Sequence, residues 1–89
     1  MMPRFIAVHT LPGSEAEFLE MSKELTPRIP EGFTWKLSYC DFENHKFFCE
    51  WEAPSREALS QAFYSTYKIP FEAIYPVKLF NVAKAELEA

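Results

Sequence analysis

The chain of 89 residues has only two glycines, Gly13 and Gly32, and two cysteines, Cys40 and Cys49. So few glycines exclude a glycine-rich phosphate-binding loop, and no nucleotide cofactor is expected. The two cysteines match neither a zinc-binding pattern nor a redox C-x-x-C pair. No apolar run is long enough to span a membrane, and no leader with a cleavage site is recognised. We therefore expect a protein of the reducing cytoplasm with no membrane partner.

Clustered basic residues are also missing. Nine lysines and arginines stand against thirteen acidic residues, for a net charge of −4, and the basic residues are scattered along the chain. Nucleic-acid binding requires clustered Lys and Arg, so this class of partner is excluded. The sequence shows no Ser-His-Asp or Cys-His constellation, and no catalytic residue is assigned. A binding protein is therefore favoured over an enzyme.

Apolar and aromatic residues, in contrast, are abundant. Hydrophobic residues make up 48% of the chain and aromatic residues 17%. A chain of this length forms one domain, here residues 1–89, with a single small core. Because each aromatic side chain adds a large apolar surface, part of the surplus is expected to be buried between subunits.

Residues 33–41 and 45–53 are rich in alternating aromatic residues and predict a β-hairpin. The connection at residues 42–44 predicts a three-residue turn with Asn44 in the left-handed conformation. This turn fixes a register that gives one apolar face and one mixed face. The expected pairs are Trp35–Trp51, Leu37–Cys49 and Tyr39–Phe47 on the apolar face, and Lys36–Glu50 and Ser38–Phe48 on the other.

The rest of the chain divides into two strands and two helices. Residues 3–10 alternate as a strand, and Ser14 with Glu17 forms an S-x-x-E capping box that starts a helix ending at Pro27. Ser55 is the expected N-cap of a second helix that breaks at residues 67–70. Residues 74–83 predict a last strand, which Pro76 places at a sheet edge, and residues 84–89 a frayed tail.

The resulting order βαββαβ predicts an α+β fold of the ferredoxin-like type. Its antiparallel sheet has four strands in the order 4-1-3-2, with both helices on one face. The helix-covered face is expected to carry Ile6, Val8, Trp35, Leu37, Tyr39, Phe47, Cys49, Trp51, Val77 and Leu79. The open face is expected to carry Phe5, Ala7, His9, Lys36, Ser38, Cys40, Phe48, Glu50, Glu52, Lys78 and Phe80.

The open face is too apolar to face water alone, because it includes three phenylalanines. A second copy of the chain, placed sheet against sheet, is the preferred cover and makes the protein a homodimer. A monomer with a few exposed aromatic residues is the alternative. The dimer face is predicted to comprise Phe5, Lys36, Phe48, Glu50, Lys78 and Phe80.

Potential metal ligands gather where the first strand, the second strand and the start of the third meet. These residues are His9, Cys40, Asp41 and His45. Imidazole, thiolate and carboxylate groups bind first-row transition metals, so nickel, copper and zinc are the candidate metals for this site. The alternative is that both histidines are ordinary strand-end residues and that Asp41 only caps the turn. Cys49 stands among aromatic residues in the sequence and is expected to be a small apolar residue of the core.

Four stretches of the chain resemble a known family. They are the Leu-Pro-Gly that ends the first strand, TWKLSYCD at 34–41, KFFCEWEAPSREAL at 46–59 and IPFEAIYPV at 69–77. They are similar to a group of small bacterial proteins, mostly of unknown function, that have the ferredoxin-like fold and form dimeric α+β barrels. Some members are described as nickel-binding. The resemblance implies a divalent transition metal such as nickel as the cofactor, and Cys49 as a further ligand.

Three interpretations follow. The leading one is a homodimer that binds a small ligand or a transition metal at the strand-end edge or in the dimer cavity. The second is a cofactor-free barrel enzyme, of the monooxygenase or cyclase type, that holds an apolar aromatic substrate between helices and sheet. The third is a structural or interaction module without a ligand. The predicted ligand pocket is lined by Trp35, Phe47, Trp51, Phe63 and Tyr67.

Overall fold

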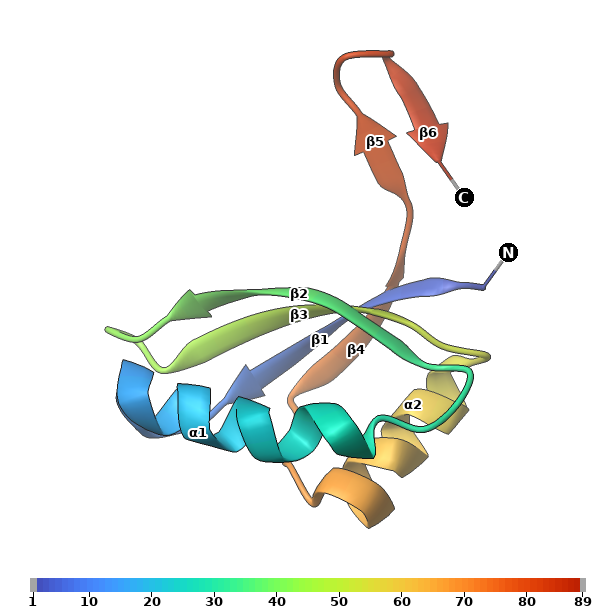
Figure 1. The fold of residues 1–89 in the computed structure, drawn as a ribbon. Coiled ribbons are helices and arrows are strands. Elements are labelled where there is room, and N and C mark those ends of the chain that lie inside the picture. Colours follow the sequence, from blue (N-terminus) through green and yellow to red (C-terminus); the bar gives the residue numbers. More distant parts are fainter. Residues whose placement is uncertain (1, 89) are drawn as a thin grey trace.

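The computed structural model describes residues 2–88 and contains a four-stranded antiparallel sheet with two helices (Figure 1). The main elements are β1 (Arg4–Thr10), α1 (Glu15–Leu25), β2 (Thr34–Asp41), β3 (Lys46–Glu52), α2 (Arg56–Ala62) and β4 (Ala73–Val77). The strand order β2-β3-β1-β4 is the predicted order read from the opposite edge. Both helices lie on the same face of the sheet (Figure 1). The predicted α+β class, strand order and helix placement are therefore confirmed.

The predicted start of the first helix is also confirmed. The Ser14 hydroxyl accepts a hydrogen bond from the Glu17 amide at 3.2 Å, and the Glu17 carboxylate accepts one from the Ser14 amide at 3.0 Å. This reciprocal pair is a complete capping box. The α-helix ends at Leu25, and a 3-10 turn at Thr26–Arg28, with Pro27 in its first turn, follows directly.

The prediction for the two faces of β1 is wrong. Phe5, Ala7 and His9 are buried on the helix side, whereas Ile6 and Val8 are half-buried on the open side. Pairing with β3 sets this choice, because directly paired residues share a face and His9 lies opposite Phe47. Both faces of this strand carry apolar side chains, so alternation alone could not tell them apart.

The predicted hairpin register holds only at its open end. Trp35 pairs with Trp51 as expected, but the register shifts before Leu37, so that Lys36 is the extra residue of a β-bulge. One added residue exchanges the two faces of the strand. Leu37 and Tyr39 are therefore 42% and 69% exposed, and not buried as predicted.

Beyond the bulge, two predicted members of the open face move to the helix side. Ser38 pairs with Cys49, and Cys40 pairs with Phe47. The turn also differs from the prediction, because it spans four residues and the left-handed residue is His45, with φ 58°, in place of Asn44.

The predicted dimer face is changed by the same corrections. Phe5 is 4% exposed within the core, so it is not part of the open face. Glu50 pairs with Arg4, whose Nε lies 3.1 Å from the carboxylate, and not with Lys36. Phe48 is 40% exposed on the open face, as predicted. Lys78 and Phe80 lie outside the four-stranded sheet.

The C-terminal segment forms a separate hairpin where a long last strand and a frayed tail were predicted. β4 occupies the sheet edge, as Pro76 suggested, but it ends at Val77. Val77 pairs with Arg4 and therefore lies on the open face, not on the helix-covered face as predicted. After Lys78, β5 (Leu79–Asn81) pairs with β6 (Glu86–Glu88). This hairpin projects from the sheet on the side opposite the helices (Figure 1). Of the predicted tail, Ala89 lies outside the described residues.

The core lies between the sheet and the helices. Its buried members are Phe5, Ala7, Leu25, Phe47, Cys49, Trp51, Ala53, Leu59, Ala62, Phe63, Tyr67 and Ile74. Within α2, the buried residues are Leu59 and Ala62. Across residues 2–88, neither helix is long and apolar enough to cross a membrane.

Candidate functional site

A cavity of about 30 Å³ lies within the core between sheet and helices. Its lining comprises His9, Leu11, Phe18, Met21, Leu25, Ile29, Trp35, Phe47, Cys49, Trp51, Phe63, Tyr67 and Ile69. All five residues of the predicted ligand pocket are present in this lining, together with two of the predicted metal ligands, His9 and Cys49. A space of this volume has room for a water molecule.

A π-helical turn shapes one wall of the cavity. It continues α2 over Phe63–Tyr67 and ends at Lys68, which has the left-handed φ of 54°. Both Phe63 and Tyr67, the two ends of this turn, are buried and line the cavity. Such turns are rare and occur frequently at functional sites.

Aromatic rings form much of the wall. Trp35 and Trp51 stack with ring centroids 5.7 Å apart and an interplanar angle of 8°. Phe63 contacts Trp51 edge to face at 5.7 Å. These two tryptophans are the only ones in the chain, so its indole signals report on this region alone.

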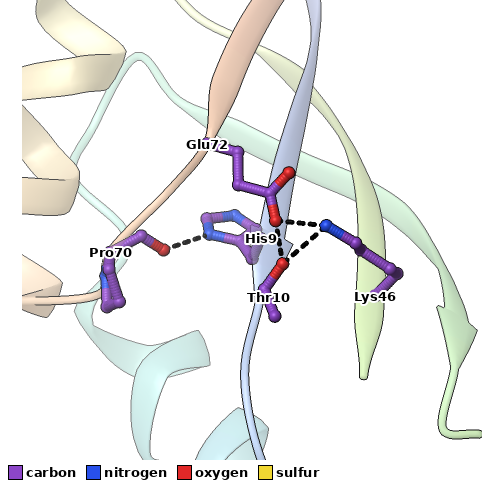
Figure 2. A network of polar contacts seen from close by, with 5 residues as sticks. All are labelled: His9, Thr10, Lys46, Pro70 and Glu72. Carbon is purple, nitrogen blue, oxygen red and sulfur yellow. Dashed lines mark hydrogen bonds and ion pairs between the residues drawn. The ribbon is translucent and has the colours of Figure 1, made fainter. Parts of the chain in front are cut away.

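His9 is the most polar side chain of the cavity, and it is 4% exposed. Its Nδ1 lies 2.8 Å from the carbonyl oxygen of Pro70 (Figure 2). A carbonyl only accepts, so Nδ1 carries the proton and Nε2 remains as an acceptor in the neutral ring. Burial lowers the pKa of His9, and the Pro70 hydrogen bond and the Glu72 carboxylate oppose this only in part. The imidazole is therefore neutral at pH 7.

Two further polar atoms of the lining are buried without a hydrogen-bond partner among the described residues. They are Trp51 Nε1 and the Tyr67 hydroxyl. Burial also raises the pKa of Tyr67, so its hydroxyl keeps its proton. Because an unpartnered buried donor costs free energy, such atoms indicate a bound water or ligand.

The two cysteines are poorly suited to act as free thiolates. Burial raises the pKa of Cys49 to about 11, against a smaller opposing effect of a hydrogen bond with Ser38. Burial also raises the pKa of Cys40, which is half-buried beside the core. Both thiols are therefore protonated at pH 7 in the absence of a metal.

Asp41 and His45 lie apart from the cavity, at the tip of the β2–β3 hairpin. The Asp41 carboxylate accepts hydrogen bonds from the Asn44 amide at 3.0 Å and the Asn44 side chain at 2.8 Å. The side-chain bond and then the backbone bond lower the pKa of Asp41, and the charge of His45 adds to this shift. Asp41 thus caps the turn, as the alternative interpretation proposed, and its carboxylate is ionised beside an exposed imidazole.

Most of the predicted metal ligands therefore fall into two sets. His9 and Cys49 line the cavity, whereas Asp41 and His45 occupy the hairpin tip. The fifth residue, Cys40, belongs to neither set and packs half-buried against the core. Within residues 2–88, no three His, Cys, Asp or Glu side chains are grouped closely enough to hold a metal ion. The structure does not bring the predicted five residues together as one site.

Sequence reasoning missed a polar network beside His9. The Lys46 ammonium donates to the Thr10 hydroxyl at 2.8 Å and forms an ion pair with Glu72, and the Thr10 hydroxyl also donates to Glu72 (Figure 2). The three residues come from β1, β3 and the approach to β4. No local motif links positions so distant in sequence, so only the sheet pairing could reveal this network.

The fold and cavity define a small α+β protein with a mainly apolar space between its helices and its sheet. Comparison with family models identifies the family further: residues 5–77 match the model described as nickel responsive protein SCO4226-like. The chain belongs to the SCO4226-like family, which confirms the resemblance seen in its sequence. No curated protein and no solved structure matches the chain significantly.

Proposed function

We propose that the chain is a ferredoxin-like homodimer that binds a nickel-type divalent cation at the hairpin tip. The observation that carries this proposal is family membership, because the name of the family refers to a response to nickel. The reducing cytoplasm remains the proposed compartment, since it preserves free thiols such as Cys40 and Cys49.

Asp41 and His45 are the favoured ligands of the five predicted from the sequence. Nickel(II) accepts imidazole nitrogen and carboxylate oxygen, and both groups are near each other at the surface. His9 already donates through Nδ1 to Pro70, and the buried Cys49 thiol resists deprotonation. The hairpin tip therefore offers ligands at a lower energetic cost than the cavity does.

A site built on two protein ligands needs further donors. Since residues 2–88 of one chain supply no group of three ligands, water and a second copy are the proposed sources. Nickel bound in this way would link its uptake to self-association of the protein.

The open face of the sheet supports the proposed dimer. Four of its side chains are large, apolar and substantially exposed: Leu37 42%, Tyr39 69%, Phe48 40% and Tyr75 56%. A sheet face of this composition is typically covered by another surface. A second copy placed sheet against sheet would form the dimeric α+β barrel.

Native mass spectrometry of the full chain, titrated with Ni²⁺, tests the metal site. Asp41→Asn and His45→Ala each remove one ligand, and the exposed Glu57→Gln variant in α2 is the control. Loss of a group that only supports a ligand typically weakens metal binding about 10- to 100-fold, so loss of a ligand should cost about tenfold or more. Wild-type affinity in both variants would refute the proposed ligands.

Sedimentation equilibrium tests the dimer. Tyr39→Asp places a charge in the open face, whereas Leu19→Asp places one on α1, where Leu19 is 58% exposed. We expect dimers for the wild type and Leu19→Asp, and dissociation for Tyr39→Asp. A monomeric wild-type protein would refute the dimer, and metal binding would then be measured on the single chain.

A further inference from the structure

We propose that the cavity between sheet and helices is a binding site for a small aromatic molecule that carries a hydroxyl group. This site is separate from the hairpin tip and needs no metal. Three features of the molecule support it: an aromatic wall, buried polar atoms without partners, and a loosely covered side through which a ligand can enter.

The aromatic wall suits a flat apolar ring by its chemistry. Trp51 contacts Trp35 on one side, by stacking, and Phe63 on another, edge to face. Phe47 and Tyr67 complete the aromatic part of the lining. An aromatic ligand gains both area burial and favourable ring geometry from such surroundings.

The lining residues carry polar atoms that offer hydrogen-bond partners to a ligand hydroxyl group. Trp51 is 4% exposed and Tyr67 is 8% exposed, yet Trp51 Nε1 and the Tyr67 hydroxyl have no partner among the described residues. His9 adds an acceptor, Nε2, because its Nδ1 donates to Pro70. A ligand hydroxyl can accept from a donor such as the indole N–H and donate to an acceptor such as the imidazole. Pairing of this kind removes the cost of leaving buried groups unsatisfied.

Entry of a ring requires the cavity to expand beyond its 30 Å³. A cavity of about 150 Å³ is known to hold benzene, so several side chains must move. Helix α1 is the element that can yield, since only Leu25 of its residues is buried. Phe18 and Met21, which line the cavity from α1, are half-buried. Few buried apolar contacts allow local opening at small cost.

The test uses phenol and toluene, two rings of similar size of which only phenol has a hydroxyl group. Each is titrated into the full chain in the presence of EDTA, and the two indole N–H signals are followed by ¹⁵N–¹H correlation NMR. We expect phenol to shift both indole signals saturably and to bind about tenfold more tightly than toluene. Hydrogen exchange of α1 should change when phenol binds.

Tyr67→Phe removes the buried hydroxyl of a residue that lines the cavity, and Tyr64→Phe changes an exposed tyrosine three residues earlier as the matched control. Both changes keep the ring, so both variants should fold. We expect phenol binding to weaken about three- to tenfold in Tyr67→Phe and to remain unchanged in Tyr64→Phe.

Three results would overturn the proposal. They are equal affinity for toluene and phenol, no saturable shift of either indole with phenol, or equal phenol affinity in the two tyrosine variants. Because EDTA removes metal from the assay, each result is independent of nickel binding at the hairpin tip.

Discussion

Protonation of His9 is expected to destabilise the fold below pH 6.5. The ring is 4% exposed, and burial lowers its pKa below the ordinary value of 6.5. The Pro70 hydrogen bond and the Glu72 carboxylate favour the charged ring, but they offset the cost of burying that charge only in part. The folded state therefore favours the neutral ring, and the unfolded state accepts the proton more readily.

The sign and size of the effect follow from proton linkage. Between the folded pKa and 6.5, the unfolded chain binds more protons than the folded chain, so the free energy of unfolding falls as the pH falls. The contribution of His9 is fully present above 6.5 and is lost progressively as the pH decreases towards the folded pKa. One such group can remove at most about 1.4 kcal/mol between pH 7.5 and 5.5.

Urea unfolding at pH 7.5, 6.5 and 5.5 measures this loss. His9→Asn keeps an N–H donor near the Pro70 carbonyl but does not titrate, so its unfolding free energy should vary less across this range. His45→Asn changes the only other histidine, which is exposed, and should keep the wild-type pH dependence. The reasoning fails if His9→Asn and the wild type show the same dependence. NMR titration of both imidazole rings provides a direct check of the lowered pKa.

Three substitutions test the fold, each by urea unfolding at pH 7.5. Ser14→Ala removes the acceptor for the Glu17 amide and should cost about 1 kcal/mol, and no change would show that the capping box is dispensable. Leu59→Ala, at a side chain with 0% exposure, should cost about 2–5 kcal/mol, whereas Leu19→Ala, at 58%, should change stability by less than about 0.5 kcal/mol. Equal effects would contradict the placement of the core. Gly32→Ala should cost about 1–2 kcal/mol through its backbone alone, because φ is +89° and a Cβ there meets no atom within 4 Å. A neutral result would mean that the turn readily adopts another conformation.

Local signals in the sequence were sufficient for the order of the helices and strands from β1 to β4, but not for the β5–β6 hairpin that follows. The capping box of Ser14 and Glu17 fixes a helix start through contacts three residues apart. Alternation in residues 46–52 identified the helix-side residues of β3, because three buried residues alternate with more exposed ones. Strand order then followed from the βαββαβ sequence of elements, since few topologies fit it.

The faces of β1 and β2 depended on contacts that are remote in sequence. Period-two alternation separates a strand into two sets but does not say which set is buried when both are apolar. In β2, the bulge at Lys36 exchanged the sets within one strand. This single extra residue exposed Tyr39 and moved Cys40 to the helix side, and no turn signal marks it.

The residues of the predicted ligand pocket were named from the sequence because buried aromatic residues of strands and helices meet in a core of this topology. Their arrangement required the tertiary structure. His9 joined the cavity only because β1 turns that face towards the helices, and its proton is placed by Pro70, 61 residues away. The sequence by itself therefore determined the helices and strands from β1 to β4, their order and a set of aromatic residues, which are properties of local periodicity and capping. Strand pairing and burial, which join distant segments, decided the faces of two strands, the separation of the metal-ligand candidates and the polar atoms of the cavity.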